Sequence, residues 1–415
     1  MTTQTTDASE AGQAHVFWRY WLATTVSEVG SAMTAVALPL VAVTALDATV
    51  LETTLLAATS QAAWLIMGLP AGVIVQRYPL RSLQVTLDLV RLVAIGSVPV
   101  AWWMGHLTYA HLMVAAFVSG LATVLFAIGN STFLPAVVDK SELSSRNSLM
   151  SGTLAVTQTG GPSVSGLLIQ LTGPVAVLAV DAVSFLVSAV TLRTLPERRP
   201  LAQSPAKTGQ LIREGWNYVV HHPVMGPCLV FATLMNFVTA ALFALTPLYL
   251  VREVDVSATV VGLVIAMDGV GALVGSAVAT RLAQRVGTAR AVIVACLFGG
   301  ATTLAIPLTT SLSNIYFYGL GMAGFAFGTV IGSIMTRTHR QTESPPELLS
   351  RVMATVRFVS WGALPLGAAL SGVLASAAGL RTALWATCVG ALVAPVPLLL
   401  SSVRRRRDLS DEPRD

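Results

Sequence analysis

Long apolar stretches recur along the chain from Phe17 to Val403, and short polar breaks separate them. Each stretch holds about 20 residues or more, the length that an α-helix needs to cross the hydrocarbon core of a bilayer. We therefore expect an all-α polytopic membrane protein with twelve transmembrane helices. The predicted helices cover residues 17–45, 52–76, 83–104, 110–132, 147–172, 174–195, 224–250, 257–281, 288–308, 313–336, 351–377 and 380–403.

Composition and charge agree with a membrane location. Of the 415 residues, 54% are apolar and only 11% are charged, and the mean hydropathy is +0.72, values that soluble domains do not reach. Most of the 25 Lys and Arg residues fall in alternate breaks, whereas only Arg252 and Arg381 lie in the intervening loops. The positive-inside rule then places both termini in the cytoplasm, and we expect a bacterial inner-membrane protein. The basic stretch Arg404–Arg407 is interpreted as a lipid-headgroup anchor and not as a nucleic-acid site.

One polar connection is much longer than the others. Residues 196–223 contain several prolines and then an amphipathic stretch at 211–220, which predicts a linker ending in a surface helix. This connection divides the chain into an N-terminal cytoplasmic tail (1–16), a first six-helix bundle (17–195), a cytoplasmic linker (196–223), a second six-helix bundle (224–403) and a basic cytoplasmic tail (404–415).

The two halves of the sequence repeat. Glu142–Arg146, which precedes the fifth predicted helix, recurs as Glu347–Arg351 before the eleventh, 205 residues later. Arg77 after the second helix corresponds to Arg281 after the eighth at nearly the same offset. Because six helices precede each recurrence, the two units insert with the same orientation. A parallel repeat of this kind predicts two pseudo-symmetric bundles around a central cavity that opens alternately to either side.

Several motifs resemble those of the major facilitator superfamily. The most specific likeness is to its twelve-helix drug:proton antiporter branch, which includes macrolide-type exporters and the enterobactin exporter. Gly68–Arg81 resembles the superfamily's loop motif between the second and third helices, although Gln76 stands where the family has an acid, which puts a charge-based latch in doubt. The other similar segments are 87–91, 159–166, 180–186, 213–224 and 350–353. The resemblance implies proton-coupled export of a small apolar or amphipathic compound.

Charged residues inside apolar helices are candidates for function, because each costs about 2.5–3.5 kcal/mol on insertion scales. Glu28 and Asp268 fall near the middle of the first and eighth predicted helices, and Asp181 lies in the sixth. A carboxylate in a cavity wall can carry a proton or bind a cationic substrate. The alternative for each, favoured for Asp181, is a permanent pair that holds helices together.

Other residues suggest gating and bending. Asp88 and Arg91 are spaced to face each other on one helix, and this favours a structural pair, with gating as the alternative. Arg77, Arg81 and Arg357 complete the predicted charge network. The small residues and proline predict a hinge or close helix packing, and the resemblance implies that the fifth helix meets the eighth across the two halves. The hinge and seal candidates are Gly160, Gly161, Pro162, Gly166, Gly271 and Gly275.

Aromatic residues within the apolar stretches are candidates for lining a substrate pocket. Packing in the core or against lipid is the alternative for each of them. These candidates are Trp64, Phe237, Phe243, Phe325 and Trp361.

The sequence contains no nucleophile elbow, phosphate loop or metal-ligand cluster. We therefore expect a protein that is not an enzyme and that needs no cofactor or metal. The expected partners are a small-molecule substrate, protons and membrane lipids, with no nucleic acid, and we expect a monomer. Export of a siderophore or another endogenous metabolite, uptake in place of export, and a non-transporting receptor on the same fold remain alternatives.

Overall fold

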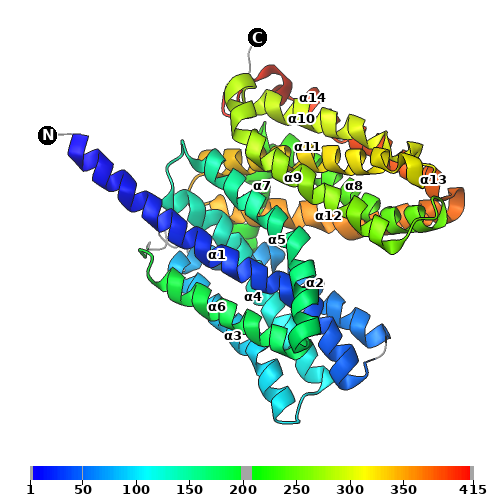
Figure 1. Cartoon of the computed structure of the whole chain (residues 1–415). Coiled ribbons are helices and arrows are strands. Elements are labelled where there is room, and N and C mark those ends of the chain that lie inside the picture. Colours follow the sequence, from blue (N-terminus) through cyan, green and yellow to red (C-terminus); the bar gives the residue numbers. More distant parts are fainter. Residues whose placement is uncertain (1–2, 49, 198–207, 412–415) are drawn as a thin grey trace. The chain divides into compact units, whose positions relative to one another are not determined.

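The computed structural model of the chain describes residues 3–48, 50–197 and 208–411, and these ranges are almost entirely helical (Figure 1). Every predicted apolar stretch forms a helix. The long helices are α1 (Thr3–Leu46), α2 (Val50–Arg77), α3 (Leu80–Trp103), α4 (Tyr109–Val137), α5 (Leu143–Thr172), α6 (Pro174–Arg193), α7 (Thr208–His221), α8 (Met225–Arg252), α9 (Ala258–Val286), α10 (Thr288–Thr303), α11 (Tyr316–Glu343), α12 (Leu349–Ala378) and α13 (Leu380–Val393), followed by the short α14 (Val396–Leu400).

Ten helices in the described part of the chain are long and apolar enough to cross a membrane. The protein is therefore a multi-pass membrane protein. The two remaining predicted spans are α2 and α5, which are helical over 28 and 30 residues. In α2 the described apolar stretch is limited to Ile66–Arg77, and α5 is rich in Ser, Thr and Gly.

Contacts divide the chain into two compact units. Unit 1 comprises residues 1–143, 156–215 and 344–355, and unit 2 comprises residues 144–155, 216–343 and 356–415. The first residues of α5 thus belong to unit 2, and the first residues of α12 belong to unit 1. These two segments overlap the recurring motif at Glu142–Arg146 and Glu347–Arg351.

The same helix pairing occurs within each unit. In unit 1, α6 packs against α1 and α3, while α4 packs against α2 and α3. In unit 2, α13 packs against α8 and α10, while α11 packs against α9 and α10. The pattern follows the order of the helices in each half, so the internal repeat of the sequence is also a repeat of structure.

Glycines in the left-handed backbone region form three of the tight helix junctions. Gly173 separates α5 from α6 with φ 83°, and Gly379 separates α12 from α13 with φ 89°. Gly287, with φ 90°, separates α9 from α10, and a Cβ there would lie 2.3 Å from the carbonyl oxygen of Arg407. Side chains other than glycine rarely adopt this backbone conformation. Gly173 and Gly379 stand at equivalent places in the two halves.

The predicted amphipathic linker helix is α7. Leu211, Gly215 and Val219, spaced four residues apart, are buried, whereas Arg213, Glu214 and neighbouring polar residues are exposed. One helical face therefore packs against protein.

Candidate functional site

A buried ion pair lies on α3 in unit 1. Arg91 Nη2 donates to Asp88 Oδ1, and the two side chains are 3% and 0% exposed. The guanidinium of Arg91 also lies over the rings of Phe126 on α4 and Phe185 on α6, at 4.1 and 4.6 Å from their centroids. Such cation–π contacts contribute about 0.5–2 kcal/mol each. The predicted pair is therefore held between aromatic rings, which the sequence analysis did not identify.

Asp181 of α6 faces α1. Its Oδ2 accepts a hydrogen bond from the Thr34 hydroxyl of α1, and its Oδ1 accepts one from Ser184 Oγ at 2.9 Å. Gly30, one turn before Thr34, makes room for the carboxylate, because a Cβ there would lie 2.1 Å from Asp181 Oδ1 and 2.2 Å from Ser184 Oγ. This close approach lets Asp181 be fully buried with both oxygens hydrogen-bonded.

Four of the predicted charged residues form one cluster in unit 1. Asp88 interacts electrostatically with Arg91 and with Glu28 of α1, and Asp181 interacts with Arg91 and Asp88. We call Glu28, Asp88, Arg91 and Asp181 the charge cluster. It joins α1, α3 and α6, and it contains three carboxyl groups and one guanidinium.

A polar network adjoins the charge cluster. Tyr20 Oη donates to Asn130 Oδ1 at 2.8 Å, and Gln84 Nε2 donates to the same oxygen at 2.8 Å. The Tyr20 ring stacks on Phe133 with centroids 4.8 Å apart, and Tyr20 interacts electrostatically with Glu28. Tyr20 and Gln84 are both fully buried. Tyr20 of α1 and Gln84 of α3 precede Glu28 and Asp88 by one to two helical turns, so the network extends from the cluster toward the side that the Lys and Arg distribution predicts to be cytoplasmic.

Asp268, another predicted intramembrane carboxylate, lies on α9 in unit 2. It is half-buried, and no hydrogen bond or ion pair joins it to another residue within 208–411. The glycines that follow it pack on α11, because a Cβ at Gly271 would lie 2.0 Å from the Ala323 carbonyl oxygen and one at Gly275 would lie 2.8 Å from that of Phe327. A role for these glycines in a seal with the fifth helix stays a prediction.

The fifth helix meets α9 through other residues. Within unit 2, Ser148 Oγ and Thr280 Oγ1 are 3.1 Å apart, and a Cβ at Gly152 would lie 2.9 Å from Ser276 Oγ. Further along α5, in unit 1, Gly161 packs against Ala32 of α1.

The remaining hinge candidates on α5 make no close packing contact in the described part. A Cβ at Gly160 or at Gly166 would meet nothing within 4 Å. The side chain of Pro162 lies outside the described residues. A role for these three residues as a hinge stays a prediction.

Gln76, which stands where the family motif has an acid, hydrogen-bonds in unit 1. Its Oε1 accepts from Arg351 Nε at 2.8 Å, and its Nε2 donates to the Glu347 carbonyl oxygen at 2.6 Å. Arg351 also pairs with Glu214 of α7 at 2.7 Å, and its own side chain is 4% exposed. We call Gln76, Glu214, Glu347 and Arg351 the Arg351 latch. The neutral amide of Gln76 thus contacts Arg351, although its lack of charge puts a charge-based latch at this motif in doubt.

The backbone of α2 approaches α12 closely beside this latch. Ser350 Oγ donates to the Gly72 carbonyl oxygen at 2.6 Å, and a Cβ at Gly72 would lie 2.8 Å from Ala354 Cβ. In unit 2, the corresponding segment of α5 is fixed by Asn147, whose amide donates to Gln341 Oε1 at 2.6 Å.

The other predicted gating arginines lie elsewhere. Arg77 is exposed at the end of α2, and Arg81 forms a partly exposed ion pair with Glu197 at 2.7 Å, a kind of pair that stabilises by only about 0–1 kcal/mol. Arg357 of α12 lies over the Trp361 ring at 4.1 Å.

The aromatic candidates have different surroundings. Phe325 is buried within the apolar core of unit 2, and Phe243 packs against that core. Trp64 packs against a smaller core in unit 1. In unit 2, the backbone of Phe237 lies against Gly367. These contacts favour core packing for Phe325 in particular.

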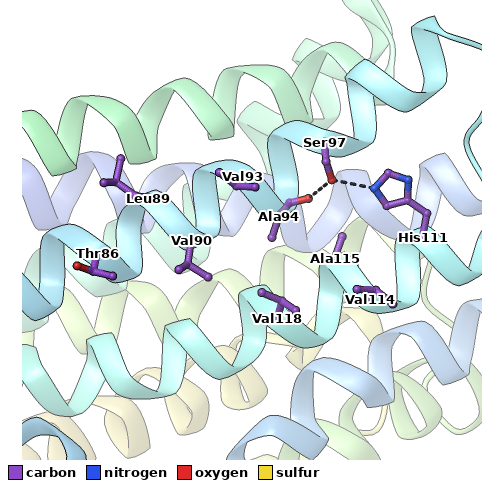
Figure 2. Close-up of a pocket in the computed structure, with 10 residues that line it drawn as sticks. All are labelled: Thr86, Leu89, Val90, Val93, Ala94, Ser97, His111, Val114, Ala115 and Val118. Carbon is purple, nitrogen blue, oxygen red and sulfur yellow. Dashed lines mark hydrogen bonds between the residues drawn. The ribbon is translucent and has the colours of Figure 1, made fainter.

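Figure 2 shows a groove of about 490 Å³ on unit 1, lined by α3 and α4. Its walls are mostly apolar, and Val93 and Val114 are largely exposed. Ser97 and His111 hydrogen-bond to each other at 2.8 Å at one end. An exposed apolar groove on a membrane-spanning helix pair is typical of a lipid-facing surface.

Comparisons with known proteins agree with a transporter. Residues 11–415 match the model of a family described as "Transmembrane secretion effector". The multidrug efflux pump Tap of Mycolicibacterium fortuitum is 25% identical over 369 residues, covering 84% of this chain and 87% of that protein. The enterobactin exporter EntS of Escherichia coli O81 (strain ED1a) is 26% identical over 302 residues, covering 71% of each.

Solved structures share the fold. The crystal structure of a bacterial homologue of the iron transporter ferroportin, in an outward-facing state, aligns with a TM-score of 0.78 at 15% sequence identity. The alignment covers 92% of this chain and 98% of that one. At this identity the likeness concerns the fold alone.

Proposed function

Because the chain belongs to the transmembrane secretion effector family of major facilitator superfamily transporters, we propose that it exports a small apolar or amphipathic compound by proton antiport with alternating access. As a member of this family it is a transporter of small molecules and not an enzyme. The proposal concerns the direction of transport, the class of cargo and the coupling ion.

The observation that carries the proposal is the charge cluster of unit 1. It holds three carboxyl groups: Asp88 forms an ion pair with Arg91, Asp181 interacts electrostatically with Arg91, and Glu28 interacts electrostatically with Asp88. One guanidinium balances one carboxylate at a time, and an uncompensated charge away from water costs several kcal/mol. With more carboxyl groups than basic groups among its four members, the charge cluster is therefore a suitable site for a proton or a cationic substrate.

Movement of the cationic substrate is coupled to movement of the proton if binding of one disfavours binding of the other. A proton that enters the charge cluster removes one negative charge and weakens its attraction for a cation, and a bound cation makes protonation less favourable. Asp268 of unit 2 is a second candidate for carrying protons, since it is half-buried.

Everted membrane vesicles test the coupling. Vesicles containing the chain, with an imposed proton gradient, should accumulate a lipophilic cation such as tetraphenylphosphonium, and the protonophore-sensitive part should be lost in Glu28→Gln and Asp88→Asn. Glu253→Gln serves as the matched control, because Glu253 is an exposed residue after α8. Accumulation that remains at the wild-type rate in Glu28→Gln would refute the role given to Glu28.

A siderophore or another endogenous metabolite is the second candidate cargo. The similarity to an enterobactin exporter over 71% of the chain favours it. A susceptibility panel separates the two candidates. Expression in a pump-deficient bacterial host should raise resistance to lipophilic drugs and dyes if these are the cargo, and no shift across the panel would favour the endogenous compound.

A further inference from the structure

Buried basic residues gather at one end of unit 2, remote in sequence from the charge cluster. The last turns of α11 carry Arg337, His339 and Arg340, and His339 and Arg340 are 6% and 8% exposed. The C-terminal segment contributes Arg406, which is 9% exposed. His222, in the turn before α8, is half-buried. The distribution of Lys and Arg predicts that this end faces the cytoplasm.

The C-terminal segment is fixed in place, so that Arg406 belongs to a defined structure. Ala289 N donates to the Arg407 carbonyl oxygen at 3.1 Å, and Thr288 N donates to Asp408 Oδ1 at 2.7 Å. Leu409 is buried, and its backbone N–H donates to Thr288 Oγ1 at 2.8 Å. These contacts dock the segment on the first turn of α10.

The basic groups act on one another. His339 interacts electrostatically with His222, Arg340 and Arg406, and Arg340 also interacts with Arg337. The His222 and His339 rings are 6.0 Å apart. His222 Nδ1 accepts hydrogen bonds from the backbone N–H groups of the first α8 residues at 3.2 Å, which leaves its Nε2 as the donor toward a ligand.

Few carboxylates or other hydrogen-bond acceptors pair with these basic groups in the described part of unit 2. Within residues 208–411, no carboxylate lies at ion-pair distance from Arg337, Arg340 or Arg406. Arg340 Nε, Arg406 Nε and His339 Nε2 are buried without a hydrogen-bond partner in the described part of the chain. Glu343 faces His222, and Arg406 Nη1 donates to the Asp411 carbonyl oxygen. Buried cations with unpaired donors are costly, and an anion that pairs with them offsets that cost.

We propose that His222, His339, Arg340 and Arg406 form a site for a phosphate group, presented by the headgroup of an anionic phospholipid or by free phosphate. Guanidinium groups pair with phosphate oxygens through two parallel hydrogen bonds. Basic pockets at the cytoplasmic side of membrane helices are suited to phospholipid headgroups. Pro223, beside His222, is exposed, so a phosphate could approach the site beside the start of α8.

The site would depend on pH through His222. Burial and the positive charge of Arg406 lower the pKa of His222 below its ordinary value, while Glu343 acts in the opposite direction. A phosphate dianion or monoanion beside the ring favours the imidazolium form. Binding should therefore strengthen as the pH falls below about 6.5, the ordinary histidine value.

The test uses the purified full-length chain, delipidated and titrated separately with phosphatidylglycerol, phosphatidylcholine and inorganic phosphate. Native mass spectrometry and thermal unfolding report binding. We expect phosphatidylglycerol to bind better than phosphatidylcholine, and Arg340→Gln and Arg406→Gln each to weaken it by about tenfold. Arg290→Gln is the matched control, because Arg290 is exposed on α10 and lies outside both the site and the basic stretch Arg404–Arg407.

Each arm gives a definite answer. If Arg340→Gln fails to fold, Arg340→Lys replaces it in the test. Lysine keeps the positive charge but not the planar guanidinium, so this variant should retain part of the affinity. Stabilisation by inorganic phosphate alone, lost in Arg406→Gln, would support the phosphate site with free phosphate as its source. Equal binding of both lipids with no effect of phosphate, or equal losses in Arg290→Gln and Arg406→Gln, would overturn the proposal.

Discussion

Gly30 is the position where one added methyl group should disturb the charge cluster most directly. A Cβ there would lie 2.1 Å from Asp181 Oδ1 and 2.2 Å from Ser184 Oγ. Neither atom can stay in place, and the displaced carboxylate loses its 2.9 Å hydrogen bond from Ser184. The substitution Gly30→Ala therefore perturbs Asp181 from α1 without removing any ionisable group.

The expected destabilisation follows from two effects. Overpacking a tight interior costs about 1–3 kcal/mol, and a hydrogen bond to a charged group contributes about 1.5–3 kcal/mol. Because both effects arise from the same displacement, we expect a loss of about 2–3 kcal/mol in total. Gly262→Ala is the matched control, because a Cβ there meets nothing within 4 Å and alanine favours a helix over glycine.

Thermal and denaturant unfolding in detergent, followed by circular dichroism, measures this effect. A double-mutant cycle with Asp181→Ala isolates its origin. Removing the carboxylate also removes the clash with it, so Gly30→Ala should cost at least about 1 kcal/mol less in the Asp181→Ala background. Equal stability of Gly30→Ala and Gly262→Ala, or strictly additive effects in the cycle, would refute the packing described here.

Three further predictions follow from the other contacts. Arg91→Lys should lower the transport rate but lower the unfolding temperature less than Arg91→Ala does, because lysine keeps a charge beside Asp88 but loses the planar stacking on the aromatic rings. Transport rates and unfolding temperatures of the two variants measure this. Gln76→Leu should remove two hydrogen bonds from the Arg351 latch and destabilise by about 1–3 kcal/mol, whereas Gln76→Glu should retain the bond from Arg351; unfolding midpoints that do not separate the two variants would contradict it. His222 has a lowered pKa in the folded protein, so the unfolded chain binds more protons, and stability should decrease as the pH falls through about 6.5; pH-dependent unfolding should show a smaller decrease in His222→Asn.

The sequence predicts the helices well because hydropathy and the internal repeat are local, additive signals. The partners of intramembrane residues are less predictable. A helix that is apolar on nearly all sides, such as α9, carries little information about which face meets which neighbour. The glycines Gly271 and Gly275 illustrate this, since the sequence alone did not identify α11 as a helix on which they pack.

The candidate site was predictable only in part. Insertion cost alone identifies Glu28, Asp88 and Asp181 as unusual residues. Their assembly into one cluster depends on tertiary contacts, such as that between Thr34 and Asp181, which are 147 residues apart in the chain. Gln76 shows the opposite limit. Its loss of charge relative to the family motif suggested a missing contact, but an amide can accept from Arg351 as a carboxylate does.

Proton movement during transport is the most direct test of the proposed antiport. Liposomes containing the purified chain and an internal pH indicator would be loaded with tetraphenylphosphonium and diluted, alongside protein-free liposomes. We predict that the loss of the cation drives protons inward, so that the internal pH falls with the wild-type chain and not with Asp88→Asn or protein-free liposomes. Chain-dependent loss of the cation with no change in internal pH would contradict proton antiport.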